Sequence, residues 1–303
     1  MLRFARFLLI PLLLLAALLL GLLLTSHPAS RPPVLVELGD QPLVIAHRGG
    51  MGLWPENTLF AFERANALGV DMLEMDVRAS QDGELVVIHD YSLERTSNGR
   101  GPVAALSLAQ LQALDAGYTW TADGGETYPY RGQGIRIPSL AEVFSRLPDK
   151  PKSIEIKAAD TGLEERLCTL LKSAGQRDKV IVASFHERSL QLFREICPGV
   201  ATAAGPTSVR LLAALNWLGL AGVLSPSYQA LQIPPRSGDA QVASARLFDN
   251  AKARGLAVHL WTINEQPEMR QLLDMGADGL ITDYPERALQ LLGRPTRITA
   301  SKP

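Results

Sequence analysis

Two carboxylates stand two residues apart in an apolar stretch of the chain. Glu74 and Asp76 alternate with Met75 and Val77, so on a β-strand both acidic side chains project to the same face. Like charges at a buried point drive one group to protonate or require a counter-ion such as a bound cation. A solvent-exposed strand face is the alternative, but the apolar residues around the pair favour a buried strand. The spacing therefore predicts a cation site.

A third carboxylate, Glu155, interrupts another apolar run at residues 154–157. Three carboxylates without a cysteine ligand describe an oxygen-ligand site for Mg²⁺ or Ca²⁺ rather than a zinc site. A structural ion pair between Glu155 and Lys157 is the alternative. We expect Glu74, Asp76 and Glu155 to bind the divalent cation.

Two histidines follow predicted strands close to these carboxylates. His47 and His89 suit proton transfer, because the unperturbed pKa of histidine is about 6.5. A purely structural role is the alternative for each ring. Arg48 and Lys157 supply positive charge suited to a phosphoryl group. A cation, two acid/base groups and two positive side chains together fit phosphodiester cleavage.

Strand-like and helix-like segments alternate along most of the chain, which predicts an α/β fold with a parallel sheet covered by helices. The expected strands are 43–46, 73–78, 85–88, 154–157, 180–183, 200–203, 222–224, 257–262 and 279–282, and the expected helices are 59–65, 140–146, 163–173, 187–196, 208–215, 242–254, 267–275 and 285–292. The connection before 85–88 is too short for a parallel crossover and ends in Asp82-Gly83, a hairpin signal. Eight parallel strands remain, which predicts a (β/α)8 TIM barrel with its active site at the carboxyl ends of the strands.

Residues 91–137 are expected to form an irregular insertion after the second strand. The segment is rich in glycine and carries Tyr118, Trp120, Tyr128 and Tyr130. Loops of this length are usually functional lids or disordered segments.

The N-terminus is expected to be a transmembrane helix. Residues 7–24 are an uninterrupted apolar run, which at ~1.5 Å per residue nearly spans a hydrocarbon core of ~30 Å. Arg3 and Arg6 precede the run, so the positive-inside rule places the folded part outside the cytoplasm, periplasmic or otherwise extracytoplasmic. A cleaved signal peptide is the alternative, but the run is long for one and no clean small-x-small site precedes Ser30. We expect an uncleaved single-pass anchor within residues 1–26.

Composition bounds the remaining organisation. Residues 27–42, rich in Pro and polar residues, are expected to be a linker, 43–292 the barrel, and 293–303 a C-terminal tail. A formal net charge of −1 with scattered Lys and Arg argues against nucleic acid as a partner. Cys168 and Cys197 could form one bridge in an oxidising compartment, but two buried thiols are the expectation.

A series of motifs in fixed order resembles the glycerophosphodiester phosphodiesterase family over residues 43–292. The motifs are His47-Arg48-Gly49, Pro55-Glu56-Asn57-Thr58, Leu73-Glu74-Met75-Asp76-Val77, His89-Asp90 with Leu93-Glu94-Arg95-Thr96, Ile137-Pro138-Ser139-Leu140, Ile154-Glu155-Ile156-Lys157 and Val258-His259-Leu260-Trp261-Thr262-Ile263-Asn264. The resemblance implies a (β/α)8 barrel and metal-dependent hydrolysis of glycerophosphodiesters to sn-glycerol 3-phosphate and an alcohol.

By position, the resemblance also implies roles for single residues. It implies metal binding by Glu74, Asp76 and Glu155, acid/base catalysis by His47 and His89, phosphate binding by Arg48 and Lys157, and a place in the pocket wall for Trp261.

Two other functions stay open. A membrane anchor and an aromatic insertion would also suit a lysophospholipase D reaction, with the insertion holding the acyl chain. A catalytically silent barrel that binds a phosphorylated ligand is the other candidate, although no expected ligand or acid/base residue is missing. Asn264, His186 and Asp283 also follow predicted strands, where a loop or cap role and a substrate contact are equally expected.

Overall fold

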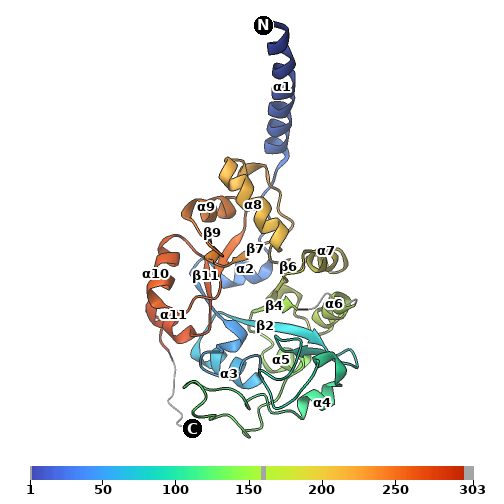
Figure 1. Ribbon diagram of the computed structural model, residues 1–303, viewed down its shortest axis with the longest axis vertical. Helices are drawn as coiled ribbons and strands as arrows, with labels where there is room; N and C mark the ends of the chain where they lie inside the picture. The colour runs from blue at the N-terminus through green and yellow to red at the C-terminus, as the bar shows by residue number, and fades with distance from the viewer. Residues whose placement is uncertain (1, 158–161, 297–303) are drawn as a thin grey trace.

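The computed structural model describes residues 2–157 and 162–296, and the side chains of these except residues 2–10 and 12. One helix, α1 (Leu2–Thr25), stands away from a rounded domain that contains the rest of the chain (Figure 1). The expected tail at 293–303 lies partly outside the described residues.

Eight parallel strands form the wall of a nearly closed barrel. In spatial order they are β6 (Ala201–Thr202), β5 (Val180–Ala183), β4 (Lys152–Ile156), β2 (Met72–Ala79), β1 (Leu43–Ala46), β11 (Gly279–Thr282), β10 (Ala257–Leu260) and β7 (Ala230–Ile233). The two ends of this sheet meet at a single parallel bridge between Ala203 and Ala230. Near-continuous apolar strands are typical of parallel sheets buried on both faces. The expected barrel of eight parallel strands is confirmed.

The hairpin after the second strand is also confirmed. Strand β3 (Leu85–Val87) pairs antiparallel with β2, with Val77 opposite Val87. The turn uses Gly83 at a φ of 83°, a conformation that costs glycine little. Because β3 runs back along β2, the chain returns to the level of Asp76, whose carbonyl accepts a hydrogen bond from the Ile88 amide at 3.0 Å.

One expected strand is wrong. Residues 222 and 223 lie in a 3-10 turn, η4 (Ala221–Val223), residue 224 follows it, and the seventh strand of the chain is β7 instead. The β7 sequence is short and is interrupted by Gln232, which weakens its apolar pattern. In the barrel this amide has polar partners, since Gln232 Nε2 donates to Ser153 Oγ at 3.1 Å.

Helices cover the outside of the barrel (Figure 1). They are α3 (Leu59–Leu68), α5 (Leu140–Arg146), α6 (Leu163–Ser173), α7 (Glu187–Ile196), α8 (Pro206–Leu218), α9 (Ala245–Ala253), α10 (Gln266–Asp274) and α11 (Pro285–Leu291). Side-chain caps define three of these starts. Thr58 Oγ1 accepts from the Ala61 amide at 3.1 Å, Ser139 forms a capping box with Glu142, and Ser244 Oγ accepts from the Leu247 amide at 3.3 Å. A short hairpin of β8 (Arg236–Ser237) and β9 (Ala240–Gln241) precedes α9.

The segment expected to be a linker is part of the domain. Residues 33–38 form a short helix, α2 (Pro33–Leu38), whose Val34 and Leu35 side chains are buried. They pack with inward-facing strand residues such as Leu43 and Ile281. Strand interiors of such a barrel must be filled, so α2 belongs to the core, and the domain begins before residue 43.

The insertion is ordered by its own aromatic packing. It contains a 3-10 turn, η2 (Val103–Ala105), and a short helix, α4 (Leu108–Gln112). Tyr130 contacts both Phe60 and Trp120 edge to face, with ring centroids 5.0 and 4.9 Å apart. The Trp120 indole also donates to the Met51 carbonyl at 3.0 Å. These rings hold the insertion to the barrel.

The two cysteines are bonded to each other, so the expectation of two separate thiols is wrong. Cys168 in α6 and Cys197 directly after α7 form a disulfide with a Cα–Cα distance of 5.6 Å. The bridge joins two neighbouring helices on one side of the barrel.

The expected membrane segment lies in α1. Residues 7–10 and 12 of that segment have side chains outside the described ones. Within the part of the chain that the structure describes, no helix combines the length and the apolarity needed to cross a membrane.

Candidate active site

The predicted site residues gather at the carboxyl end of the barrel. A cavity of about 560 Å³ opens there. Seven of the eight line it, namely His47, Arg48, Glu74, His89, Glu155, Lys157 and Trp261. The eighth, Asp76, lies beneath them and is 1% exposed.

The three carboxylates converge because of strand register. In the parallel pair β2 and β4, Asp76 lies opposite Glu155, and the period of two brings Glu74 to the same face as Asp76. One oxygen from each of the three carboxylates lies within 4.8 Å of the other two. Burial and the charge of Asp76 raise the pKa of Glu74 to about 7, and burial raises the pKa of Glu155. Three acidic groups this close together need nearby positive charge to offset their mutual repulsion.

Two cations supply part of the missing charge. Lys157 Nζ lies 2.8 Å from Glu155 Oε1 and 3.2 Å from Asp76 Oδ1, so the expected ion pair exists alongside the cluster. Arg48 Nε lies 3.2 Å from Asp76 Oδ2. Burial raises the pKa of Asp76, but the charges of Lys157 and Arg48 outweigh burial and lower it overall.

The donor set fits a divalent cation. Asp76 Oδ1 is buried and accepts no hydrogen bond from the described residues, although Lys157 Nζ lies 3.2 Å away, and burial together with the charge of Asp76 raises the pKa of Glu74 to about 7. Carboxylate oxygens are the ligands that Mg²⁺ and Ca²⁺ prefer. Glu74, Asp76 and Glu155 could therefore hold such an ion.

An aspartate orients the first histidine. His47 begins a 3-10 turn after β1, η1 (His47–Gly49), and its Nδ1 lies 2.6 Å from Asp283 Oδ1, while Nε2 faces Glu74 Oε2 at 3.9 Å. Asn264 fixes Asp283 in turn, donating from Nδ2 to Oδ2 at 2.7 Å. Burial lowers the pKa of His47, but the hydrogen bond to Asp283 and the charge of Glu74 raise it overall. Of the three residues left open in the sequence, Asp283 and Asn264 support the site.

A second aspartate orients the other histidine. His89 Nδ1 lies 2.6 Å from Asp90 Oδ1, and burial lowers the pKa of His89 more than this bond raises it. Arg95 Nε donates to Asp90 Oδ2 at 2.6 Å, and its Nη1 donates to Glu56 Oε2 at 2.6 Å. Glu56 also accepts from Arg48 Nη1 at 2.9 Å. Hydrogen bonds between charged groups thus connect His89 with Arg48, both of which line the cavity.

Asn57, which the sequence offered only as part of a family motif, is a supporting residue. Its φ of 58° lies in the left-handed region, where asparagine is tolerated better than most residues. Its Nδ2 donates to Asp76 Oδ2 at 2.8 Å, and its Oδ1 accepts from the Asp76 amide at 3.2 Å. Asp76 lies in β2, 19 residues further along the chain, so spacing alone does not reveal this contact.

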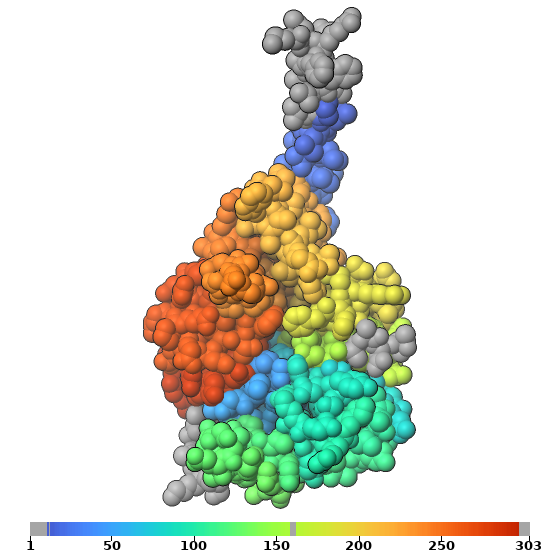
Figure 2. Space-filling model, viewed as in Figure 1, coloured from blue at the N-terminus to red at the C-terminus, as the bar shows by residue number. Residues whose placement is uncertain are grey.

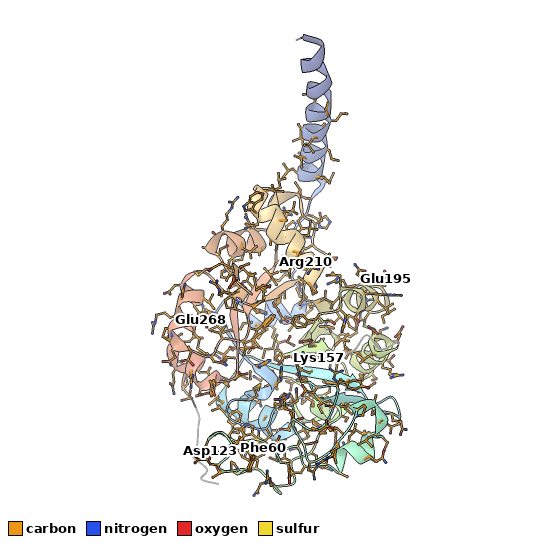
Figure 3. The ribbon with its side chains drawn as sticks, viewed as in Figure 1. Phe60, Asp123, Lys157, Glu195, Arg210 and Glu268 are labelled. Carbon is orange, nitrogen blue, oxygen red and sulfur yellow. A yellow bond between two sulfur atoms is a disulfide. The ribbon has the colours of Figure 1, made fainter. Side chains whose placement is uncertain are left out.

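One side of the cavity is apolar. This wall includes Phe185, Ala203, Ala204, Pro206, Val209, Ala213, Ile233, Val242 and Trp261. Phe185 and Trp261 meet edge to face with ring centroids 5.6 Å apart. Figure 3 shows Arg210 of α8 and Lys157 of the charged side, which line the same cavity. The aromatic residues of the insertion do not line this cavity, so the expectation that they hold an acyl chain has no support here.

Comparison with known proteins agrees with this geometry. The sequence profile of the Glycerophosphoryl diester phosphodiesterase family matches residues 47–287. A glycerophosphodiester phosphodiesterase of Caldanaerobacter subterraneus subsp. tengcongensis is 35% identical over 257 residues, which are 82% of this chain and 97% of the relative. A lysophospholipase D of Homo sapiens is 27% identical over 301 residues, 90% of this chain and 94% of the relative.

A solved structure shares the fold and bears a ligand. A phosphodiesterase from Oleispira antarctica, in complex with the product sn-glycerol-3-phosphate, has a TM-score of 0.67 and 28% sequence identity, and the match covers 84% of this chain and 97% of that one. The profile match, the 35% identical relative and the barrel fold all point to the same family. The chain belongs to the glycerophosphoryl diester phosphodiesterase family and is a phosphoric diester hydrolase.

Proposed function

We propose that the chain hydrolyses glycerophosphodiesters to sn-glycerol 3-phosphate and an alcohol by metal-dependent, two-histidine acid/base catalysis. The observation that supports this proposal most strongly is that an oxygen-ligand cluster and two histidines lie together at one cavity. Each histidine is hydrogen-bonded to an aspartate. The product bound to the Oleispira antarctica structure supports this choice of product.

The chain's own residues account for the proton transfers. Glu74, Asp76 and Glu155 would hold Mg²⁺ or Ca²⁺, which would supply Lewis-acid polarisation of a phosphoryl oxygen. One of His47 and His89 removes the proton of the glycerol 2-hydroxyl, whose oxygen attacks phosphorus, and the other protonates the departing alcohol oxygen. Water then opens the cyclic glycerol phosphate with the two histidine roles reversed.

The remaining site residues bind and orient the substrate. Arg48 and Lys157 face the cavity beside the carboxylates, where positive charge attracts the phosphoryl oxygens. Arg48 Nε lies 3.2 Å from Asp76 Oδ2 and Arg48 Nη1 donates to Glu56 Oε1 at 2.9 Å, so two carboxylates hold the guanidinium at the edge of the cavity. Trp261 forms part of the wall against which the organic part of the substrate lies.

Lysophospholipids are the second candidate substrates, and the apolar wall of the cavity favours them. Val209, Ala213 and Val242 lie in that wall. Burial of an acyl chain against apolar surface of this kind is favourable. The human lysophospholipase D to which the chain is similar supports this candidate.

We also propose that residues 1–26 anchor the chain in a membrane with the barrel outside the cytoplasm. The support is the apolar run at 7–24, the arginines before it, and leucines of α1 such as Leu14 and Leu24 that are 66% and 77% exposed. The disulfide between Cys168 and Cys197 supports an oxidising compartment.

Removal of the cation tests the main proposal. After dialysis against EDTA, we expect no release of sn-glycerol 3-phosphate from glycerophosphocholine, and recovery when Mg²⁺ or Ca²⁺ is returned. Glu155→Gln should lose this recovery and the cation binding measured by titration calorimetry, because a charged ligand is replaced by a neutral one. Glu63→Gln, on the surface beside Arg146, is the matched control. Full activity in EDTA would remove the cation from the mechanism.

Substitution of the histidines tests the proton transfers. His47→Ala and His89→Ala should each lower kcat by at least about 100-fold, the usual effect of a positioned proton-transfer group. Asp283→Asn should lower kcat with little change in KM, because it disturbs only the ring orientation of His47. His186→Ala, on an exposed loop outside the cavity, should behave as the wild type. If either alanine variant kept a tenth of the activity, the two-histidine scheme would fail.

A substrate panel decides between the two substrate classes. We expect choline release from glycerophosphocholine in either case, and release from lysophosphatidylcholine only if the apolar wall binds the acyl chain. Val209→Asp should then lower kcat/KM for lysophosphatidylcholine by at least about tenfold, since a charge on that wall is costly to bury, and leave glycerophosphocholine within about twofold. Equal losses on both substrates would reject the acyl-chain site.

Thiol trapping tests the location of the barrel. In cells quenched with acid and denatured, we expect Cys168 and Cys197 to react with a maleimide-polymer reagent only after reduction. The mature chain should also be found in the membrane fraction and retain its first residues. Two reactive thiols before reduction would contradict the oxidising location, and an N-terminus near Ala29 would indicate a cleaved signal sequence.

A further inference from the structure

Helix α8 has an apolar stripe on its solvent side. Of its thirteen residues only Leu212 is buried. Leu211, Trp217 and Leu218 are 50%, 80% and 57% exposed, and Ala214 between them is exposed as well. The positions 211, 214, 217 and 218 recur every three or four residues, so their side chains share one face of the helix. Single exposed apolar residues are ordinary, but a contiguous stripe marks an interaction surface.

The stripe is continuous with the base of α1. Turn η4, which begins three residues after the end of α8, contacts the end of α1. Ser26 Oγ donates to the Gly222 carbonyl at 2.7 Å, and the His27 amide donates to Ser225 Oγ at 3.2 Å. A β-carbon on Gly222 would lie 3.2 Å from Leu23 Cδ2. Figure 2 shows the gold surface of α8 directly below the blue stem of α1.

The opposite end of α8 borders the catalytic cavity. Pro206, Val209 and Ala213 form part of the cavity wall, and Arg210 lies between this wall and the exposed face. In Figure 3 Arg210 lies between Lys157 and the base of α1. One helix thus connects the mouth of the cavity with the start of the N-terminal helix.

Basic groups lie at both ends of the stripe. Arg210 is exposed near its start, and Arg246 of α9 is exposed near its end, where Nη2 would lie 3.6 Å from a β-carbon on Gly219. Arginine forks bind phosphate groups well, and tryptophan favours the boundary between lipid and water. An apolar stripe with basic ends is typical of helices that lie in a membrane surface.

We propose that the stripe of Leu211, Ala214, Trp217 and Leu218 docks on the lipid bilayer and holds the mouth of the catalytic cavity at the membrane surface. A substrate with an acyl chain then reaches the charged cluster along α8 without leaving the lipid phase. The consequence for substrate choice rests on the proposed phosphodiesterase function, whereas the contact with lipid does not.

Fluorescence of the full chain in phosphatidylcholine nanodiscs tests the contact. Brominated acyl chains quench tryptophans that touch them. We expect quenching in the wild type, its loss in Trp217→Phe, and its retention in Trp120→Phe, whose ring packs on Tyr130 and donates to the Met51 carbonyl. The insertion that contains Trp120 lies at the end of the molecule opposite α1 (Figure 1). Quenching unchanged in Trp217→Phe would overturn the proposal. The proposal would also be overturned if the wild type showed no quenching and cross-linking through α8 joined two chains. That result would indicate a contact between two copies instead.

Kinetics supply the second readout. The double variant Leu211→Ser/Leu218→Ser should lower kcat/KM for lysophosphatidylcholine in vesicles by at least about tenfold, because two apolar side chains no longer enter the lipid. Soluble glycerophosphocholine should be cleaved within about twofold of the wild-type rate, which also shows that the variant is folded. If no phosphodiester is cleaved by any form, the proposed function fails while the quenching result still decides the docking. Equal rates of the two forms on vesicles would contradict docking.

Discussion

The site depends on the repulsion among three carboxylates, two of them buried and the third partly buried. Strand register places Asp76 opposite Glu155, and strand periodicity adds Glu74 on the same face. Arg48 and Lys157 lie beside these charges, but Asp76 Oδ1 accepts no hydrogen bond from the described residues. Three carboxylates arranged in this way have the oxygen ligands that a hard divalent cation prefers.

A second layer of charged residues holds this cluster and its histidines in place. Asp283 and Asp90 each fix one imidazole through Nδ1, which leaves the other ring nitrogen for the substrate. Arg95 and Glu56 connect Asp90 with Arg48, so a residue of the insertion reaches the charged side of the cavity. Groups fixed in this way need little rearrangement when charge develops during a reaction. The insertion therefore contributes to the site through support rather than by covering it.

The cavity joins two environments of opposite polarity. Its charged side belongs to the strand ends, and its apolar side belongs largely to α8 and the residues around it. Because turn η4, close after α8, bonds to the base of α1, the apolar side of the cavity and the N-terminal helix lie on the same side of the molecule.

Local sequence patterns alone determined most of the strands and several of the helices of this protein. The apolar period placed seven of the eight barrel strands, the Asp82-Gly83 turn produced the hairpin, and helices such as α6 and α7 begin and end where their patterns predicted. Strand periodicity also paired Glu74 with Asp76. Only tertiary structure decided the strand at Gln232, the burial of α2, the bond between Cys168 and Cys197, and the partner of His47. Each of these depends on segments far apart in the sequence that meet once the barrel closes, and no local period encodes such a meeting.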